Sequence, residues 1–412
     1  MAEPFRVLHL ADLHLDTAFR GRSETVREAL RRATREAFDN AVTTAIERGA
    51  HAVLLAGDVF DSEVLTFATE AFLLDGCRRL EAAGIRVVYC TGNHDPGGAS
   101  HRARALDWPA NVDLAHSATP KTFTIRGADG EPVGRVVSAG FAKKEQYDNL
   151  AAKFPAMDGS LPTVGLLHTQ VEGAEAGDAH TPYAPSTRSD FDKPGYHYWA
   201  LGHIHKRQQV FPDLPVHYPG NLQGRHPREP GPKGGNWVEI PPMGLARTEF
   251  VPLAPLEWQS VTVRDPAGDS LDALVAELAG RVPGAAADQR IIRLALEGAS
   301  PLAEELARDD NRAELEAHLA GRLGALDVEV RVGELHRPVD LAELRETPSP
   351  LATGLALREQ AMVDDALLDR LVPATLSPAA PSDAGERRAY LRELLADMEP
   401  ELVARLVAPE GG

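Results

Sequence analysis

Side chains that can bind metal ions follow five short apolar runs in the first half of the chain. The runs end in ADLH, AGD, TGNHD, LLH and LGHIH, and the side chains are Asp12, His14, Asp58, Asn93, His168, His203 and His205. Carboxylates and imidazoles together suit Mn, Fe or Zn better than Ca. In layered α/β folds, ligands collect just beyond the carboxyl ends of strands. The pattern therefore predicts one site for divalent metal ions.

A pair of metal ions at this site would supply the chemistry of phosphate-ester hydrolysis. Two ions roughly 3.5–4 Å apart acidify a water and bind the phosphoryl oxygens, and they need about seven protein ligands, one of them bridging. Each motif alone has a plainer interpretation, because Gly57-Asp58 after a strand is most often a turn. His203 and His205, however, alternate and so share one face of a strand. Taken together and in this order, the motifs favour the metal centre.

The metal-binding motifs lie in a strand–helix alternation that fills about the first 255 residues. We expect strands at 5–10, 52–56, 86–91, 133–139, 163–167, 198–201 and 237–240, and helices at 25–48 and 66–83. Thr25 and Glu28 fit a capping box for the first helix. Such alternation predicts a layered α/β domain.

A second domain is expected after Pro252 and Pro255. Strands at 258–263, 290–296 and 327–332 alternate with helices at 270–279 and 309–323. The remainder is helical, acidic and interrupted by prolines. The predicted division is 1–255 for the catalytic domain, 256–340 for a small accessory domain and 341–412 for a helical C-terminal segment.

Charge and composition limit the function classes. The 412 residues carry a formal charge of −18, of which −14 falls on residues 257–412. This argues against a simple electrostatic nucleic-acid binder, although bound metal ions can still neutralise a phosphodiester locally. No apolar run is long enough to span a bilayer, and we see no signal peptide. Only two cysteines are present, Cys77 and Cys90. We expect a cytoplasmic protein that is not bound to a membrane.

The order of these motifs resembles that of the calcineurin-like metallophosphoesterase superfamily. ADLHLD, GDVFD, TGNHD and ALGHIHKRQ are similar to the SbcD-type DNA repair exonucleases, and YPGNLQGRHPREPGPKGG, from Tyr218 to Gly235, resembles most closely the bacterial YhaO branch. The resemblance is strong over 5–240 and mainly architectural from 257 onward. It implies an α/β fold, a four-layer sandwich of two β-sheets flanked by helices, with a small α+β capping domain and a helical C-terminal tail.

The resemblance also implies roles for the site residues. One ion would take Asp12, His14, Asp58 and His205, and the other would take Asp58, Asn93, His168 and His203, with Asp58 bridging. His94 would face the scissile phosphate as general acid or as a stabiliser of the leaving oxygen. Asp61 would hold and polarise His94, and Asp95 is the alternative group for that role. The cofactor would be two divalent ions, with Mn²⁺ first and Mg²⁺, Fe or Zn²⁺ as alternatives.

Five cations near GHIH are candidate DNA contacts: Lys206, Arg207, Arg225, Arg228 and Lys233. They would bind the phosphate backbone without reading sequence, and the alternative is a solvated surface loop. The C-terminal segment either packs on its own protein or, as the resemblance implies, docks on an SMC-like coiled-coil ATPase of the SbcC type. The sequence contains no G-x-x-x-x-G-K-[ST] motif of its own, and a homodimer stays open.

Three functions of different classes follow. The favoured one is a metal-dependent DNA exonuclease, with endonuclease activity left open, that works with an ATPase in DNA repair or end processing. The first alternative is a small-molecule or cyclic-nucleotide phosphodiesterase, or a phosphatase, on the same fold. The second is a catalytically inactive interaction subunit, against which the presence of all seven ligands and His94 argues.

Overall fold

The computed structural model describes residues 3–61, 65–98, 102–175, 181–284, 289–338, 349–371 and 383–396, together with 398 and 402. The chain divides into two compact units. The first comprises 1–259 with 285–290, and the second comprises 260–284 with 291–412. Each unit is described by itself.

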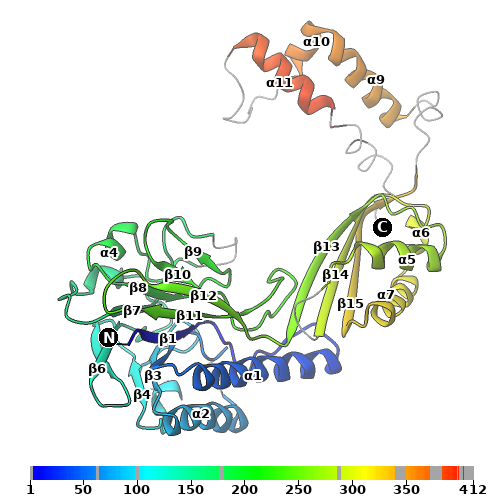
Figure 1. The fold of residues 1–412 in the computed structure, drawn as a ribbon. Helices are drawn as coiled ribbons and strands as arrows, with labels where there is room; N and C mark the ends of the chain where they lie inside the picture. The colour runs from blue at the N-terminus through cyan, green and yellow to red at the C-terminus, as the bar shows by residue number, and fades with distance from the viewer. Residues whose placement is uncertain are drawn as a thin grey trace. The chain divides into compact units, whose positions relative to one another are not determined.

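The first unit contains two six-stranded sheets (Figure 1). In one sheet, β1 (Phe5–Leu10), β2 (Ala52–Ala56), β3 (Arg86–Cys90) and β4 (Val112–Ala115) are parallel neighbours, and the antiparallel strands β11 (Gly234–Ile240) and β12 (Arg247–Pro252) continue it beyond β1. Parallel order over β1, β2 and β3 brings the carboxyl ends of these strands to the same edge.

The second sheet has the order β5-β6-β7-β8-β10-β9. Its strands are β5 (Lys121–Arg126), β6 (Pro132–Ser138), β7 (Thr163–His168), β8 (Tyr198–Gly202), β9 (Gln208–Gln209) and β10 (Val216–Tyr218). The four strands β6, β7, β8 and β10 are parallel, whereas β5 and β9 pair antiparallel at the two edges.

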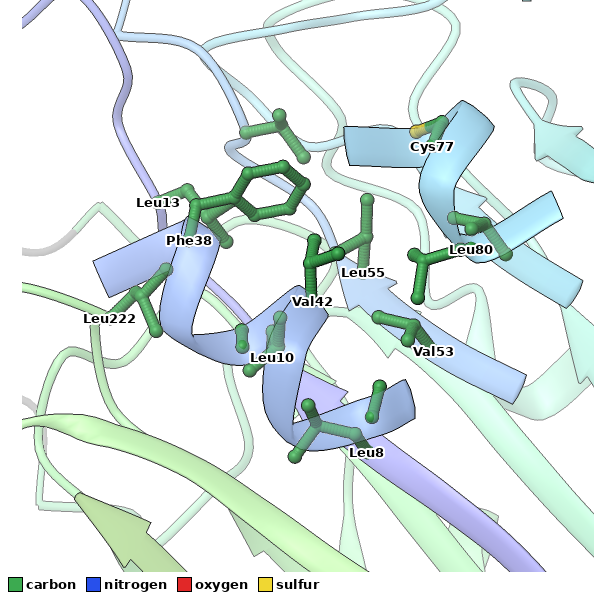
Figure 2. Packing of buried hydrophobic residues seen from close by; sticks show 14 of the residues in the cluster. Leu8, Leu10, Leu13, Phe38, Val42, Val53, Leu55, Cys77, Leu80 and Leu222 are labelled. Atoms are coloured by element: carbon green, nitrogen blue, oxygen red, sulfur yellow. The ribbon is translucent and has the colours of Figure 1, made fainter. Parts of the chain in front are cut away.

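Alternating side chains along the strands create the four layers. Leu8 and Leu55 point to the outer face of the first sheet, where α1 (Glu24–Glu47) and α2 (Phe67–Ala82) cover them (Figure 2). Val7 and Leu54 point the opposite way and pack against the second sheet. The outer face of the second sheet packs against segments that include η1 (Ala151–Lys153) and α4 (Arg188–Asp192). The expected sandwich of two sheets flanked by helices is therefore confirmed.

Helix ends follow capping chemistry, and one differs from our prediction. Ser23 caps α1, because its hydroxyl accepts a hydrogen bond from the backbone N–H of Val26. The capping box proposed for Thr25 and Glu28 is therefore wrong: Thr25 already lies inside the helix. Thr66 caps α2 by accepting from the N–H of Thr69. The short helix α3 (Arg102–Ala105) lies between β3 and β4.

The second unit contains a three-stranded sheet and helices. Its elements are β13 (Leu256–Arg264), α5 (Leu271–Arg281), β14 (Gln289–Ala299), α6 (Ala303–Leu306), α7 (Asp309–Leu323), β15 (Asp327–His336), α9 (Pro350–Val363), α10 (Asp365–Arg370) and α11 (Ala384–Ala396); β13 and β14 begin in the first unit. The sheet has the order β13-β14-β15 and packs its apolar side chains on α5, α6 and α7. The helices α9, α10 and α11 share a smaller apolar cluster.

The division into three domains at 255 and 340 stays a prediction. In the structure the first compact unit runs to Gln259, which lies inside β13. Much of the predicted C-terminal segment, including 341–348 and 372–382, lies outside the described residues. Among the helices that the structure describes, none is long and apolar enough to cross a membrane.

Candidate metal centre

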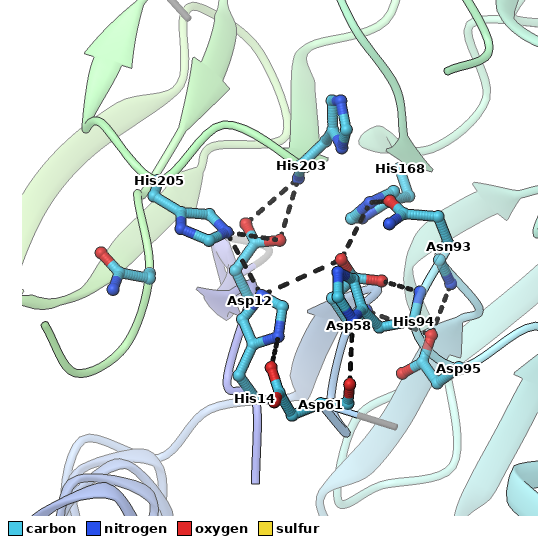
Figure 3. Close-up of polar contacts among 12 residues, drawn as sticks. Asp12, His14, Asp58, Asp61, Asn93, His94, Asp95, His168, His203 and His205 are labelled. Atoms are coloured by element: carbon cyan, nitrogen blue, oxygen red, sulfur yellow. Dashed lines mark hydrogen bonds and ion pairs between the residues drawn. The ribbon is translucent and has the colours of Figure 1, made fainter. Parts of the chain in front are cut away.

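The predicted ligands gather at the carboxyl ends of five parallel strands (Figure 3). Asp12 and His14 follow β1, Asp58 follows β2, and Asn93 follows β3. His168 ends β7, and His203 and His205 come directly after β8. The sandwich thus brings residues from both sheets to one place, as the motif spacing indicated.

The backbone at several of these strand ends is strained. Asp12, His14 and Asp58 have φ values of 51°, 47° and 50°, in the left-handed region that side chains other than glycine rarely adopt. Such residues cost about 1–3 kcal/mol each and persist where the surrounding fold enforces them, most often at functional sites. The strain turns these side chains toward the same point instead of continuing the strands.

One cluster of ligand atoms is formed by Asp12, His14 and His205, whose atoms lie within 4.8 Å of one another. Nε2 of His14 is 3.2 Å from Nε2 of His205. Nδ1 of His205 is 2.6 Å from the Glu229 carboxylate, so Nδ1 donates a hydrogen bond to Glu229. In a neutral His205 ring, Nε2 then carries a lone pair.

A second cluster is formed by Asp12, Asp58 and His168. Nδ1 of His168 donates to the carbonyl oxygen of Ala56 at 2.9 Å, so Nε2 carries the lone pair of the neutral ring. This Nε2 lies 3.0 Å from Oδ1 of Asn93 and 3.5 Å from Oδ2 of Asp58. Oδ2 of Asp58 is also 3.9 Å from Nε2 of His14, so Asp58 lies beside a histidine of the first cluster as well.

The ring of His203 belongs to none of the clusters of potential ligand atoms formed by the described residues. Its Nε2 donates to the carbonyl oxygen of Thr181 at 3.0 Å, which leaves Nδ1 as the atom that could bind a metal. Its ring lies edge-on to that of His168, with centroids 5.1 Å apart. Its backbone N–H lies 3.1 Å from both carboxylate oxygens of Asp12.

Burial shapes the charges at the site. Burial raises the pKa of Asp12 well above its ordinary value, and the neighbouring Asp58 raises it further. Burial also raises the pKa of Asp58, against the lowering effect of His94. The pKa of His14 is lowered by burial and then by the charge of Arg225. At such buried positions the ionised carboxylates of Asp12 and Asp58 are costly unless a cation lies beside them.

The donor set therefore fits divalent ions. Nε2 of His168 faces two oxygens, and Nε2 of His14 faces Nε2 of His205, at distances where lone pairs would repel unless a proton or cation lies between them. A cation would relieve this repulsion and balance the charge of Asp12 and Asp58. Oxygen and imidazole donors in this mixture are typical ligands of Mn²⁺, Fe²⁺ and Zn²⁺.

His94 forms a third group of potential ligand atoms with His14 and Asp58, and it contacts Asp61 in an unexpected way. Its Nδ1 donates to the backbone carbonyl oxygen of Asp61 at 2.9 Å, whereas the Asp61 carboxylate lies 3.1 Å from Nδ1 of His14 and 3.0 Å from Arg225. Asp95 accepts from the N–H groups of Asp58, Val59 and Gly92 and from the Tyr89 hydroxyl. Asp95 thus holds the turns after β2 and β3 together, and the catalytic role of Asp61 stays a prediction.

The five candidate DNA-binding cations occupy two kinds of environment. Arg207 and Arg228 are exposed, and so is Lys206, which pairs with Glu175; the Arg207 guanidinium lies 4.3 Å from the ring centroid of Phe250. Arg225 and Lys233 are half-buried. The Lys233 ammonium donates to the carbonyl oxygen of His205 at 3.2 Å.

Sequence reasoning missed Glu229, which contacts the site directly. Burial alone would raise its pKa, but the hydrogen bond from His205 and the charges of His205 and Arg225 outweigh burial and hold the pKa below its usual range. The signal was an acidic residue in the otherwise basic stretch RHPRE, four positions after Arg225.

A comparison with known protein families matches the part of the chain that carries this site. The family model for the calcineurin-like phosphoesterase matches residues 5–207. These residues include every predicted metal ligand together with His94. The chain thus carries a calcineurin-like metallophosphoesterase domain over these residues.

Several curated relatives share this domain. The chain is 33% identical to the uncharacterized metallophosphoesterase YhaO of Bacillus subtilis over 62% of each chain. It is 26% identical to a subunit of the nuclease SbcCD of Escherichia coli K12, over 50% of this chain and 57% of the relative. It is 28% identical to the DNA double-strand break repair protein Mre11 of Aeropyrum pernix, over 53% of each chain.

The chain thus covers 53–62% of the length of these relatives. Among solved structures, a dimetal phosphatase of Danio rerio is similar over 60% of this chain and 98% of its own, with a TM-score of 0.36 and 12% identity.

Proposed function

We propose that this protein is a metal-dependent DNA nuclease that hydrolyses phosphodiester bonds with two divalent ions. The observation that carries the proposal is the convergence of Asp12, His14, Asp58, His168 and His205 on one set of overlapping clusters of potential ligand atoms. The names of two relatives, a nuclease subunit and a DNA double-strand break repair protein, support DNA as the substrate.

The proposed ligands are those that the resemblance implies. Asp12, His14 and His205 would hold one ion, Asn93, His168 and His203 the other, and Asp58 would bridge them. When bound, such ions lower the pKa of a water and neutralise the phosphoryl oxygens, and we propose Mn²⁺ as the best activator. The chain's own contribution is to fix the imidazoles of His168, His203 and His205 in the metal-binding tautomer through the hydrogen bonds of their second nitrogens.

His94 is the proposed proton donor to the leaving oxygen. Because a carbonyl oxygen only accepts, Nδ1 of His94 carries a hydrogen for Asp61. Nε2 is then the atom that can hold a second proton and release it to the leaving group. The N–H of His94 also donates to Oδ1 of Asp58 at 2.8 Å, which fixes this histidine beside the proposed bridging carboxylate.

DNA would be bound without sequence preference, through exposed cations beside the site. Among the described residues, no hydrogen bond or ion pair holds Arg228, and Lys206 and Arg207 are exposed next to His205. Sequence-independent contacts to phosphates need only such cations. We further propose an SMC-like ATPase of the SbcC type as partner. The relative named as part of the nuclease SbcCD supports this proposal.

Comparing substrates tests the proposal. Purified protein with Mn²⁺, alone and with its ATPase, is incubated with end-labelled duplex DNA, cyclic nucleotides and a phosphopeptide, with Asp58→Ala as the inactive control. We expect metal-dependent loss of DNA that Asp58→Ala abolishes. Hydrolysis of cyclic nucleotides or the phosphopeptide without DNA cleavage would instead support the phosphodiesterase or phosphatase alternative.

The exposed cations provide a second test. Arg228→Gln should weaken DNA binding on all sequences alike and reduce the salt slope of binding by about one unit. Arg78→Gln, an exposed arginine on α2 in the outer layer, is the matched control and should leave both unchanged. Hydrolysis of bis(4-nitrophenyl) phosphate, which needs only the metal centre, should be normal in both variants. If Arg228→Gln lost DNA binding and hydrolysis of bis(4-nitrophenyl) phosphate to the same extent, Arg228 would have a structural role.

A further inference from the structure

A buried carboxylate forms a hydrogen bond with one of the proposed metal ligands. Glu229, only 6% exposed, accepts three hydrogen bonds: from Nδ1 of His205 at 2.6 Å, from the Asn221 amide at 2.8 Å and from the backbone N–H of Arg225 at 2.7 Å. These contacts fix the carboxylate and, through it, the plane of the His205 ring. The opposite nitrogen of that ring lies in the first ligand cluster.

Arg225 links this carboxylate to a second one. Its Nη1 donates to Oδ1 of Asp61 at 3.0 Å, and its Nη2 lies 3.2 Å from Nδ1 of His205 and 3.8 Å from Glu229. The same Oδ1 of Asp61 lies 3.1 Å from Nδ1 of His14. Asp61, Arg225 and Glu229, here called the charged bridge, therefore connect the outer nitrogens of His14 and His205.

The loop that carries the charged bridge is anchored. The indole N–H of Trp258 donates to the carbonyl oxygen of Gly224 at 2.9 Å, and the Gln223 amide donates to the carbonyl oxygen of Leu256 at 2.7 Å. Trp258 is 1% exposed. A loop held this way by β13 can position Arg225 and Glu229 accurately, which a solvated loop could not do.

The histidines proposed for the other ion have different partners. The outer nitrogens of His168 and His203 donate to the backbone carbonyl oxygens of Ala56 and Thr181. A carboxylate partner makes the imidazole a stronger electron donor than a neutral carbonyl does, because negative charge stabilises the N–H proton and pushes density to the metal-binding nitrogen. The two proposed metal positions therefore differ in the groups that contact the outer nitrogens of their histidine ligands.

We propose that the charged bridge of Asp61, Arg225 and Glu229 positions His14 and His205 and strengthens the binding of one of the two ions. The inference rests on the metal ligands given under the proposed function. Arg225 is then a positioning residue for the metal centre and not a DNA contact, because its guanidinium lies against Asp61 and His205 and its side chain is only 18% exposed.

Metal titration of the apo-protein tests this role. Mn²⁺ is titrated into each variant and followed by calorimetry and by the electron paramagnetic resonance of free Mn²⁺. Glu229→Gln keeps the shape of the side chain but loses its negative charge. It should weaken the binding of one Mn²⁺ ion and so raise one of the two dissociation constants by about 10–100-fold. Arg225→Lys keeps the positive charge, but an ammonium lacks the planar guanidinium that contacts both Asp61 and Glu229. This variant should raise the same dissociation constant.

Paired variants identify the ion that is affected. In a His168→Ala background only the position of His14 and His205 would remain complete, and adding Glu229→Gln should weaken its Mn²⁺ binding. In a His14→Ala background, adding Glu229→Gln should change the remaining constant little. Glu175→Gln, which removes an exposed carboxylate paired with Lys206, is the matched control and should bind both ions normally.

Several outcomes decide the proposal. Normal constants for both ions in Glu229→Gln and Arg225→Lys, with two ions bound to the unmodified chain, would overturn the inference alone. Weakening of the His168 position instead would also overturn it. If the unmodified chain binds no Mn²⁺, both the inference and the proposed metal centre fail. Thermal unfolding of each apo-protein separates a lost fold from lost affinity; if Glu229→Gln does not fold, Arg225→Lys decides the question.

Discussion

Gly92 offers a sharp test of the geometry around Asp58. A Cβ atom built at this position would lie 2.9 Å from the backbone nitrogen of Asp58 and closer still to its Oδ1. Because ordinary van der Waals contact begins near 3.4 Å, Asp58 would have to move by at least about half an ångström. Asp58 is the proposed bridging ligand, so its displacement should disturb both metal positions together.

The expected effects of Gly92→Ala on rate and stability can be estimated from the usual costs of misplacing a catalytic group and of overpacking a buried site. Misplacing a catalytic group by about 1 Å can cost about 100-fold in rate, so half that displacement predicts a loss of about 10–100-fold. Overpacking of a buried site also lowers the free energy of unfolding by about 1–3 kcal/mol. The N–H that Gly92 donates to Asp95 is retained in alanine, and the change is therefore steric alone.

The assay combines hydrolysis of bis(4-nitrophenyl) phosphate with Mn²⁺ titration and thermal unfolding of the apo-protein. Gly321→Ala is the matched control, because this glycine lies in α7, a Cβ atom added to it would meet nothing within 4 Å, and alanine stabilises helix interiors. Gly92→Ala that folds and shows normal Mn²⁺ affinity and normal turnover would refute the placement of Asp58 at the centre of the site.

Three further predictions concern single side chains. Asp58→Ala should abolish hydrolysis and lower Mn²⁺ occupancy at both positions, measured by metal analysis after loading; near-normal turnover would make the bridging assignment wrong. His94→Ala should reduce hydrolysis by about 10²–10⁴-fold while two ions stay bound, and loss of an ion would instead make His94 a ligand. Leu54→Ala, fully buried between the two sheets, should lower the free energy of unfolding by about 2–5 kcal/mol in denaturant titration; a loss below about 1 kcal/mol would contradict the packing between the sheets.

The central strands could be predicted from the sequence because they are buried on both faces. Ala52–Ala56 is a continuous apolar run, as expected for a parallel strand between two packed layers, and its bounds are those we predicted. Phe5–Leu10 likewise matches its prediction. The short strands β9 and β10, with two and three residues, were not predicted, since they are too short to show a period.

The positions of the metal ligands could also be predicted from the sequence, whereas the charged side chains that contact these ligands could not. A ligand at the end of a strand is placed by the direction of that strand, and the spacing of the motifs in the sequence reflects where each strand ends. Asp61 meets Arg225 across 164 positions of sequence, and Glu229 meets His205 across 24. Only the folded sandwich and the anchored loop bring these charges together, so the sequence could not indicate these contacts.

The most direct test of the metal centre is a crystal structure with Mn²⁺ soaked in, measured at the Mn absorption edge. We expect two anomalous peaks about 3.5–4 Å apart. One should be bound by Asp12, His14 and His205 and the other by Asn93, His168 and His203, with Asp58 between them. A single peak, or peaks that do not contact Asp58, would contradict the account.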